Sequence, residues 1–374
     1  MHRDTMILNA GYRPVSEPGA MVPGPQFAST YVAPGDPAEH RLAYGRFDNP
    51  TWTMWEEALG ALEGGHALSF ASGMAAVSAV LGVCLRRGDV VVLPSDSYYT
   101  VRTLGSSWLE TIGVEVRLAP TRGNAQAEAL DGARLLWLET PSNPLLDVCD
   151  IAALVRAAHE RSALVAVDNT TATAYLQQPL ALGADYVVAS DTKAVTGHAD
   201  LLLGHVATTD GERAKAIRDW RTRHGAIPGP MEVWLAHRSL ATLPLRLGRQ
   251  CATAERLAAF LATHAAVEAV HYPGLREHAG HATAKRQMQA FGSVVSFELS
   301  SRARAETFLR SLALVREATS FGGVHSTAER RARWGGDAIG EGFIRFSVGC
   351  EDPDDILGDV EAGLRAVSGS SPRG

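Results

Sequence analysis

The stretch Ala184-Asp-Tyr-Val-Val-Ala-Ser190-Asp-Thr-Lys193-Ala-Val-Thr-Gly-His198 decides the fold. Its first half is a β-branched apolar run, which predicts a buried strand. Lys193 follows the end of this strand and has the hydroxyl side chains of Ser190 and Thr192 beside it. A second apolar run upstream ends in the carboxylate of Asp168. Reactive side chains directly after buried strands indicate an α/β fold with its ligand site at one edge of a sheet.

Strands and helices alternate along the chain from about residue 51. Several of the strands are apolar throughout, which is typical of a mostly parallel sheet covered on both faces by helices. The predicted strands are 66–71, 89–94, 114–118, 134–140, 164–170 and 184–190, and the predicted helices are 52–62, 73–86, 99–110 and 151–161.

The two ends of the chain differ from this middle part. Residues 1–43 are rich in Gly and Pro yet carry apolar side chains, so we expect an extended arm that packs on something, such as a second subunit. After Pro230 a long helix over 232–261 leads into a small α+β domain with strands at 292–298 and 342–348 and helices at 302–312 and 353–367. The predicted division is an arm (1–43), a large domain (44–235) and a C-terminal domain (236–374).

Composition excludes several classes of function. The 374 residues have a formal net charge of −6, which gives no reason to expect nucleic acid or an anionic membrane as partner. The four cysteines are widely spaced without a C-x-x-C pair, which predicts reduced thiols and neither a disulfide framework nor a metal site. No secretory signal and no apolar run of ~18 residues is present, so we expect a cytoplasmic protein.

The side chains at the strand ends suggest a cofactor. A lysine that forms an imine, a carboxylate that holds a pyridinium nitrogen and hydroxyls that bind a phosphate together make a pyridoxal phosphate site. The local alternative is a surface lysine after a strand, with Asp168 starting a turn.

Three further strand ends carry suitable groups. Gly73 and Met74 begin a helix whose free N–H groups can bind a phosphate, although neither a P-loop nor a dinucleotide fingerprint is present. Tyr98 can stack on a flat ring or pack on the next helix, and Asn143 lies in a turn. Because the ends of parallel strands share one edge, we expect these groups near Asp168 and Lys193.

The motifs together resemble the Cys/Met-metabolism family of pyridoxal phosphate enzymes, which includes cystathionine γ-synthase, γ-lyase and β-lyase and methionine γ-lyase. The resemblance covers roughly residues 5–367 and implies fold type I, like aspartate aminotransferase, with a large domain on a mostly parallel sheet and a small α+β C-terminal domain. The matching motifs include Tyr44-Gly-Arg46, Ala71-Ser-Gly-Met74, Glu139-Thr-Pro-Ser-Asn-Pro144, Val167-Asp-Asn-Thr170, Ser190-Asp-Thr-Lys193 and Arg345-Phe-Ser-Val-Gly349.

The resemblance also implies residue roles. In the catalytic centre, Lys193 would bind the cofactor covalently and shuttle protons, Asp168 would keep the ring nitrogen protonated, and Tyr98 would stack on the ring and protonate the leaving group. The phosphate would be bound by Gly73, Met74, Ser190 and Thr192, and in a neighbouring subunit by Tyr44 and Arg46. Asn143 would orient the ring hydroxyl and contact the substrate. The substrate would also be bound by Arg345, Ser320 and Thr319. The family form is a homotetramer, a dimer of dimers with shared active sites.

Departures from the family pattern concern substrate choice. The motif at Tyr98-Tyr99-Thr100 lacks the cysteine of methionine γ-lyases, and Thr319 stands where many γ-acting members have a glutamate. Residues 325–334 also differ from the sequence that is usual in the family at this place. We interpret arginines 330, 331 and 333 in this run as a solvated face. We therefore expect γ-elimination of L-cystathionine, with γ-synthase or β-lyase activity as alternatives. Two alternative functions lie outside this group of activities. One is an aminotransferase, and the other is a non-catalytic binding protein that kept the fold.

Overall fold

The computed structural model describes residues 2–12 and 20–369 and contains two sheets. The larger sheet has seven strands in the order β1-β7-β6-β5-β4-β2-β3. Strands β2 to β6 pair in parallel, whereas β7 is antiparallel to both β6 and β1. The strands are β1 (His66–Phe70), β2 (Val90–Pro94), β3 (Glu115–Ala119), β4 (Leu135–Glu139), β5 (Leu164–Asp168), β6 (Tyr186–Ala189) and β7 (Gly204–Thr208).

Helices cover both faces of the large sheet because alternate residues of its buried strands point to opposite sides. Val91 and Trp137 pack in one core with α3 (Gly73–Cys84) and α8 (Gly211–His224). Their neighbours Val92 and Leu138 pack in another core, with α6 (Ile151–His159). The predicted mostly parallel sheet with helices on both faces is therefore confirmed.

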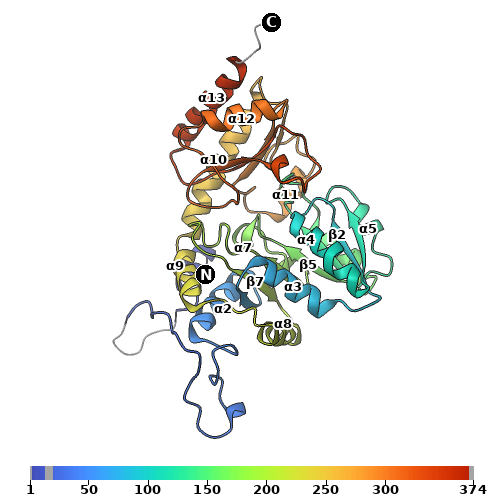
Figure 1. The fold of residues 1–374 in the computed structure, drawn as a ribbon, viewed down its shortest axis with the longest axis vertical. Coiled ribbons are helices and arrows are strands. Elements are labelled where there is room, and N and C mark those ends of the chain that lie inside the picture. The colour runs from blue at the N-terminus through green and yellow to red at the C-terminus, as the bar shows by residue number, and fades with distance from the viewer. Residues whose placement is uncertain (1, 13–19, 370–374) are drawn as a thin grey trace.

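The second sheet has five strands in the order β10-β11-β12-β9-β8 and packs against three helices of the C-terminal half. Figure 1 shows this unit on one side of the large sheet, with α10 running between the two. The strands are β8 (Ala269–His271), β9 (Val294–Glu298), β10 (Arg316–Glu317), β11 (Thr327–Arg330) and β12 (Phe343–Ser347), and the helices are α10 (Leu243–Thr263), α12 (Arg302–Ser311) and α13 (Pro353–Gly369).

The single helix predicted over 232–261 is wrong. The chain forms α9 (Pro230–Leu240) and then α10, which begins at Leu243. Pro244 lies in the first turn of α10, where its missing N–H costs nothing, whereas the same ring inside a continuous helix would clash with the preceding turn. The division of the chain at residue 235 stays a prediction, and that position lies inside α9.

Sequence analysis also missed several short elements. Strand β7, the helices α8 and α11 (His281–Gln287) and the short strands β8, β10 and β11 gave no separate expectation. The predicted helix 99–110 is only α4 (Tyr99–Leu104), continued by a π-helical turn at Gly105–Leu109. The remaining helices are α2 (Pro50–Glu63), α5 (Ala125–Glu128) and α7 (Thr173–Leu176).

The N-terminal arm is only partly extended. Residues Arg3–Asn9 form helix α1, which buries Ile7 and contacts α2. Residues 13–19 of the predicted arm lie outside the described residues. The segment 20–49 holds little regular structure and extends away from the body of the molecule (Figure 1). In the parts of the chain that the structure describes, no helix combines the length and apolarity needed to cross a membrane.

Candidate active site

A pocket of about 370 Å³ lies at the carboxyl-terminal edge of the large sheet. Because β7 is antiparallel to both of its neighbours, β1 runs in the same direction as β6, so all five chemistry-bearing strands end at this edge. The pocket is lined there by a set that we call the cofactor edge, namely Gly73, Met74, Tyr98, Asn143, Asp168, Ser190, Thr192 and Lys193. The expected convergence of the strand ends is therefore seen in the structure.

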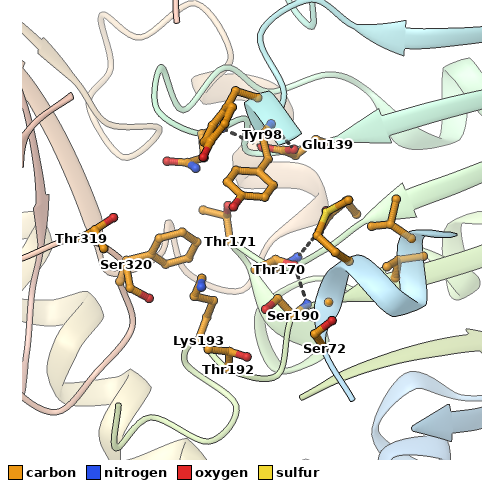
Figure 2. A pocket seen from close by; sticks show the side chains of 18 of the residues that line it. Ser72, Tyr98, Glu139, Thr170, Thr171, Ser190, Thr192, Lys193, Thr319 and Ser320 are labelled. Carbon is orange, nitrogen blue, oxygen red and sulfur yellow. Dashed lines mark hydrogen bonds between the residues drawn. The ribbon is translucent and has the colours of Figure 1, made fainter. Parts of the chain in front are cut away.

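The opposite side of the pocket comes from the C-terminal half of the chain. Thr319, Arg331 and Trp334 line it, and we call these three residues the distal wall. Ser320, Phe321 and Arg345 also line the pocket, and the centre of the Phe321 ring lies 5.6 Å from Lys193 Nζ and 5.2 Å from Arg345 Cζ. Figure 2 shows Lys193 pointing into the cavity, with Thr319 and Ser320 on one side and Ser190 and Ser72 on the other.

The first turn of α3 forms a cradle for an anion. Ser72 caps this helix by accepting a hydrogen bond from the Ala75 N–H, and the helix continues for 12 residues with its N-terminal dipole toward the pocket. A Cβ added to Gly73 would lie only 2.6 Å from the Cβ of Ser190, so glycine is required for this close approach. Backbone N–H groups at a helix N-terminus beside a serine suit a phosphate.

The surroundings of Lys193 make its side-chain amine reactive. Burial and the nearby charge of Arg345 lower the pKa of the lysine, while Asp168 acts in the opposite sense. Its Nζ atom lies 5.6 Å from the centre of the Phe321 ring and makes no hydrogen bond or ion pair with any described residue. A buried, uncommitted amine with a lowered pKa is suited to nucleophilic attack and to proton transfer.

Two carboxyl groups end adjacent strands beside this amine. Glu139 on β4 is in register with Asp168 on β5. Burial and the neighbouring Asp168 raise the pKa of Glu139 well above its usual value. Burial also raises the pKa of Asp168, against hydrogen bonds from Thr170 and the charge of Lys193. A positive partner inserted beside Asp168 would therefore be strongly favoured.

Glu139 also fixes the two neighbouring strand ends. Its carboxylate accepts hydrogen bonds from the Tyr98 N–H at 2.8 Å and from the Asn143 N–H at 2.9 Å. The Tyr98 side chain remains 37% exposed at the mouth of the pocket, and its ring meets that of Tyr99 edge-on at 5.2 Å. The sequence motif containing Glu139 was recognised, but this orienting role was not.

Arg345 on β12 forms a buried carboxylate-binding group that joins the two sheets. Its Nη1 donates to Asn143 Oδ1 at 2.8 Å, and its Nη2 donates to the Ser320 carbonyl at 2.9 Å and to Glu329 Oε1 at 2.6 Å. Ser320 has a φ of 76°, a left-handed conformation that is uncommon for serine and is found at constrained sites. Burial lowers the pKa of Arg345 to about 10. These three bonds use both hydrogens of Nη2 and one of Nη1, which leaves the Nε–H and one Nη1–H for a further acceptor.

Thr192, Tyr44 and Arg46 make contacts within the chain that were not predicted, and their roles in phosphate binding stay predictions. Thr192 lines the pocket, but its hydroxyl donates to the Leu203 carbonyl and accepts from the Leu203 N–H. Tyr44 and Arg46 do not line the pocket at all. Arg46 donates to the Thr222 carbonyl at 2.6 Å and lies over the Tyr44 ring, which is 45% exposed. The predicted contact of these two residues with another subunit stays a prediction.

The interpretation of the arginines at 330–333 as a solvated face is wrong for Arg330 and Arg331, which are only 7% and 4% exposed. Glu329 lies at the centre of this region and is completely buried behind the distal wall. Its Oε1 accepts from Arg345 and Arg331, and its Oε2 accepts from Arg333 and the Trp334 indole. Three of these partners follow Glu329 within five residues and Arg345 comes from β12, so the sequence places most of the groups together but does not show that they are buried.

A second buried cluster, also missed, lies beneath the loop that carries Lys193. His205 on β7 is held between Asp191 at 2.7 Å and Glu63 at 3.0 Å. Burial disfavours the imidazolium, but the two carboxylates outweigh burial and raise the pKa of His205 to about 10. The charged histidine therefore fixes Asp191, two residues before Lys193, to the large sheet.

Comparison with known proteins agrees with this geometry. A profile of the family described as "Cys/Met metabolism PLP-dependent enzyme" matches residues 4–365. A Streptomyces coelicolor protein provisionally assigned as a cystathionine γ-lyase is 55% identical over 97% of this chain and 93% of its own length. A cystathionine γ-lyase structure from Micromonospora echinospora is 42% identical with a TM-score of 0.91, covering 98% and 99% of the two chains. A cystathionine γ-synthase from Xanthomonas oryzae, solved with cystathionine, is 33% identical with a TM-score of 0.95, covering 99% of this chain and all of that one.

The chain belongs to the Cys/Met-metabolism family of pyridoxal phosphate enzymes, as its sequence motifs indicate. It is therefore an enzyme whose cofactor is pyridoxal 5′-phosphate, and its fold is that of this family. The pocket fits that cofactor, because an anion cradle at Gly73, the carboxylate of Asp168 and the uncommitted amine of Lys193 line one cavity.

Proposed function

We propose that this enzyme carries out γ-elimination of L-cystathionine and releases cysteine, 2-oxobutyrate and ammonia. The observation that carries the proposal is the pocket itself, in which the Lys193 amine lies between the carboxylate of Asp168 and the guanidinium of Arg345. The 55% identity to the Streptomyces coelicolor protein supports the γ-lyase among the family's activities. The absence of a cysteine beside Tyr98 argues against methionine as the main substrate.

In this proposal the α-carboxylate of the substrate binds Arg345, whose planar guanidinium is already oriented by Asn143 and Ser320. The bound cofactor supplies an electron sink for the charge left on Cα. Asp168 would hold the ring nitrogen protonated. Gly73, Met74 and Ser190 would hold the phosphate, and the predicted contact from Thr192 would require its hydroxyl to give up its bond to the Leu203 carbonyl.

Lys193 moves the protons. As a free amine beside the bound substrate, its Nζ would take the proton from Cα, pass that proton on, and then take one from Cβ, so that the Cγ–S bond could break. Tyr98, at the mouth of the pocket, protonates the departing sulfur. One water molecule is consumed when the remaining four-carbon unit is released as 2-oxobutyrate and ammonia, so the atoms balance with cystathionine and water as the reactants.

Two other activities are alternatives within the same site. The similarity to the Xanthomonas oryzae cystathionine γ-synthase keeps γ-replacement on an activated homoserine open, and β-elimination would give homocysteine and pyruvate instead. The test is to incubate the purified holoenzyme with cystathionine and identify the products. Cysteine with 2-oxobutyrate is the expected pair. Homocysteine with pyruvate, or turnover only with an activated homoserine plus cysteine, would overturn the proposal.

We further propose a cytoplasmic homotetramer in which Tyr44 and Arg46 of one subunit contact the cofactor phosphate of another. Their position outside the pocket and the exposed apolar side chains of Phe27 and Val32 on the arm support this arrangement. Mixing Lys193→Ala with Arg46→Ala subunits tests it. If sites are shared, the mixed oligomer recovers sites that carry neither substitution, so activity rises above that of both parents. No recovery in oligomers that demonstrably mix would contradict shared sites.

A further inference from the structure

The distal wall carries a charge that the proposed mechanism does not use. Of the cationic side chains that line the pocket, Lys193 serves the cofactor and Arg345 serves the α-carboxylate, which leaves Arg331. The acidic residues among the lining, Glu139 and Asp168, both belong to the cofactor end. The side of the pocket that would face the leaving group therefore presents one guanidinium and no carboxylate among the residues that line it.

Arg331 is held rigidly but is incompletely bonded. Its Nη1 donates to Glu329 Oε1 at 3.1 Å, and its Nη2 donates to Asp337 Oδ2 at 2.7 Å. Its Nε–H is buried and has no hydrogen-bond partner among the described residues. This Nε–H has no accessible surface in the pocket, so an acceptor on a ligand would use the second N–H that Nη1 and Nη2 each still carry.

Behind the distal wall there are more guanidinium groups than buried carboxylates. Glu329 is shared by Arg345, Arg331 and Arg333, and Asp337 is shared by Arg331 and Arg102, so two buried carboxylates serve four guanidinium groups. Arg333 also contacts Glu317, but that side chain is 45% exposed and its charge is screened by water. Even when Glu317 is counted, the cluster holds more guanidinium groups than carboxylates, and this excess favours anionic groups in a bound ligand.

We infer that Arg331 selects substrates whose side chain ends in a carboxylate. This inference rests on the proposed function and names the substrate class of the same site: cystathionine and succinyl-type esters of homoserine belong to it, whereas methionine and O-acetylhomoserine do not. An isolated distal ammonium finds no free carboxylate here, because Thr319 is uncharged and Glu329 is fully engaged. The indole of Trp334, fixed by Glu329 at 2.9 Å, borders the path of the alkyl chain.

The test measures binding rather than turnover, so that its failure is distinct from failure of the proposed activity. The probes are 2-aminosuberate and 2-aminooctanoate, which have equal chain lengths and no leaving group and differ only in a terminal carboxylate or methyl. Calorimetric titration of the holoenzyme gives the dissociation constant of each. In Arg331→Gln the constant for 2-aminosuberate should rise about 10-fold, the size expected for one charge-assisted hydrogen bond, while that for 2-aminooctanoate stays within about two-fold.

Arg333→Gln is the matched control, because it removes an equal charge from the same carboxylate two residues away without touching the pocket lining. It should leave the ratio of the two constants unchanged. Equal weakening of both probes in Arg331→Gln would mean that Arg331 acts only through Arg345 and would overturn the inference, as would no change at all. If that variant fails to fold, the wild-type enzyme decides: rising salt should weaken 2-aminosuberate more than 2-aminooctanoate, and equal salt dependence contradicts the inference.

Discussion

The cofactor edge and the distal wall face each other across one pocket but are positioned by different interactions. At the cofactor edge, backbone pairing of parallel strands brings Asn143, Asp168 and Lys193 to one line, and the side chains of Glu139 and His205 hold the loops that follow the strands. At the distal wall, Arg331 and Trp334 follow a four-residue strand and are held by side-chain bonds to Glu329 and Asp337. Backbone ladders tolerate changes of side chain, whereas a buried ionic network depends on every member.

This difference separates chemistry from specificity. The chain belongs to a family whose members include lyases and synthases, so one fold and one cofactor serve several reactions. All three residues of the distal wall lie at positions where we expect this chain to depart from the family pattern, whereas at the cofactor edge the expected departure is confined to the motif at Tyr98. We therefore expect substitutions at the cofactor edge to abolish chemistry and substitutions behind the distal wall to change stability and substrate affinity.

The largest effect should come from Lys193→Ala. Loss of the amine removes both the covalent attachment of the cofactor and the proton carrier, so kcat should fall by about 10³-fold or more, with loss of the visible absorption of the lysine-bound cofactor. Lys215→Ala is the control, since that side chain is 67% exposed and pairs only with Asp219. An enzyme that keeps a substantial rate without Lys193 would contradict the division of roles between the two regions.

Glu329→Gln should be the most damaging change behind the distal wall. It leaves Arg345 and Arg331 buried without their counter-charge, and breaking a buried ion pair on one side costs about 3 kcal/mol in unfolding free energy. Since Arg345 loses its orientation, KM should rise for every substrate, whatever its distal group. Glu317→Gln, which removes an exposed partner of Arg333, should change the unfolding free energy by less than about 0.5 kcal/mol.

The same glutamate gives a pH signature. Burial opposes its ionisation, but Arg345, Trp334 and Arg331 outweigh burial and lower the pKa of Glu329 below its usual value. A lowered pKa stabilises the fold above the unfolded-state pKa, and this contribution is lost as the pH falls through the folded-state value. Acid should therefore destabilise the wild-type enzyme more steeply than Glu329→Gln, and parallel acid curves for the two would show that Glu329 is not charged in the fold.

His205 gives the opposite signature on the cofactor side. Its folded-state pKa of about 10 lies above the unfolded value of about 6.5, so its contribution is complete below about pH 6.5 and is lost as the pH rises toward 10. Between pH 7 and pH 10 the wild-type enzyme should lose on the order of 2 kcal/mol more than His205→Gln, measured by denaturant unfolding of the holoenzyme. Equal alkaline losses in both proteins would mean that the histidine is neutral between Glu63 and Asp191.

The contrast between the two regions also explains what could be predicted from sequence. Strand ends at the cofactor edge were predictable because apolar runs mark buried strands, and a parallel sheet aligns their ends. The buried positions of Arg330 and Arg331 were not, because a charged run next to a short strand has the same local pattern whether it faces solvent or a carboxylate from elsewhere. Glu329 acquires its partners across β12 and the segment to Asp337, and His205 acquires its partners from α2 and the Lys193 loop. Local periodicity carries no information on such pairings.

The smallest expected effect concerns the physical link between the regions. Arg102 on α4, four residues after Tyr98, donates to the Ser97 carbonyl through Nε and to the Gly336 carbonyl and Asp337 through Nη2. Arg102→Gln should cost about 1 kcal/mol in unfolding free energy, because the arginine is partly buried and Asp337 keeps its bond to Arg331. Arg117→Gln, in a more exposed pair with Glu115, is the control.

The functional consequence of Arg102→Gln separates two ways in which the regions can be coupled. If the distal wall is fixed mainly by its own carboxylates, the KM of carboxylate-ended substrates should rise by about two-fold and kcat should not change, since Tyr98 keeps its bond to Glu139. If kcat falls as well, then the position of Tyr98 depends on the distal wall through Arg102. Protonation of the leaving group would in that case depend on the substrate group that is bound at Arg331. The ratio of the two kinetic changes therefore measures how independent the chemistry at the cofactor edge is from recognition at the distal wall.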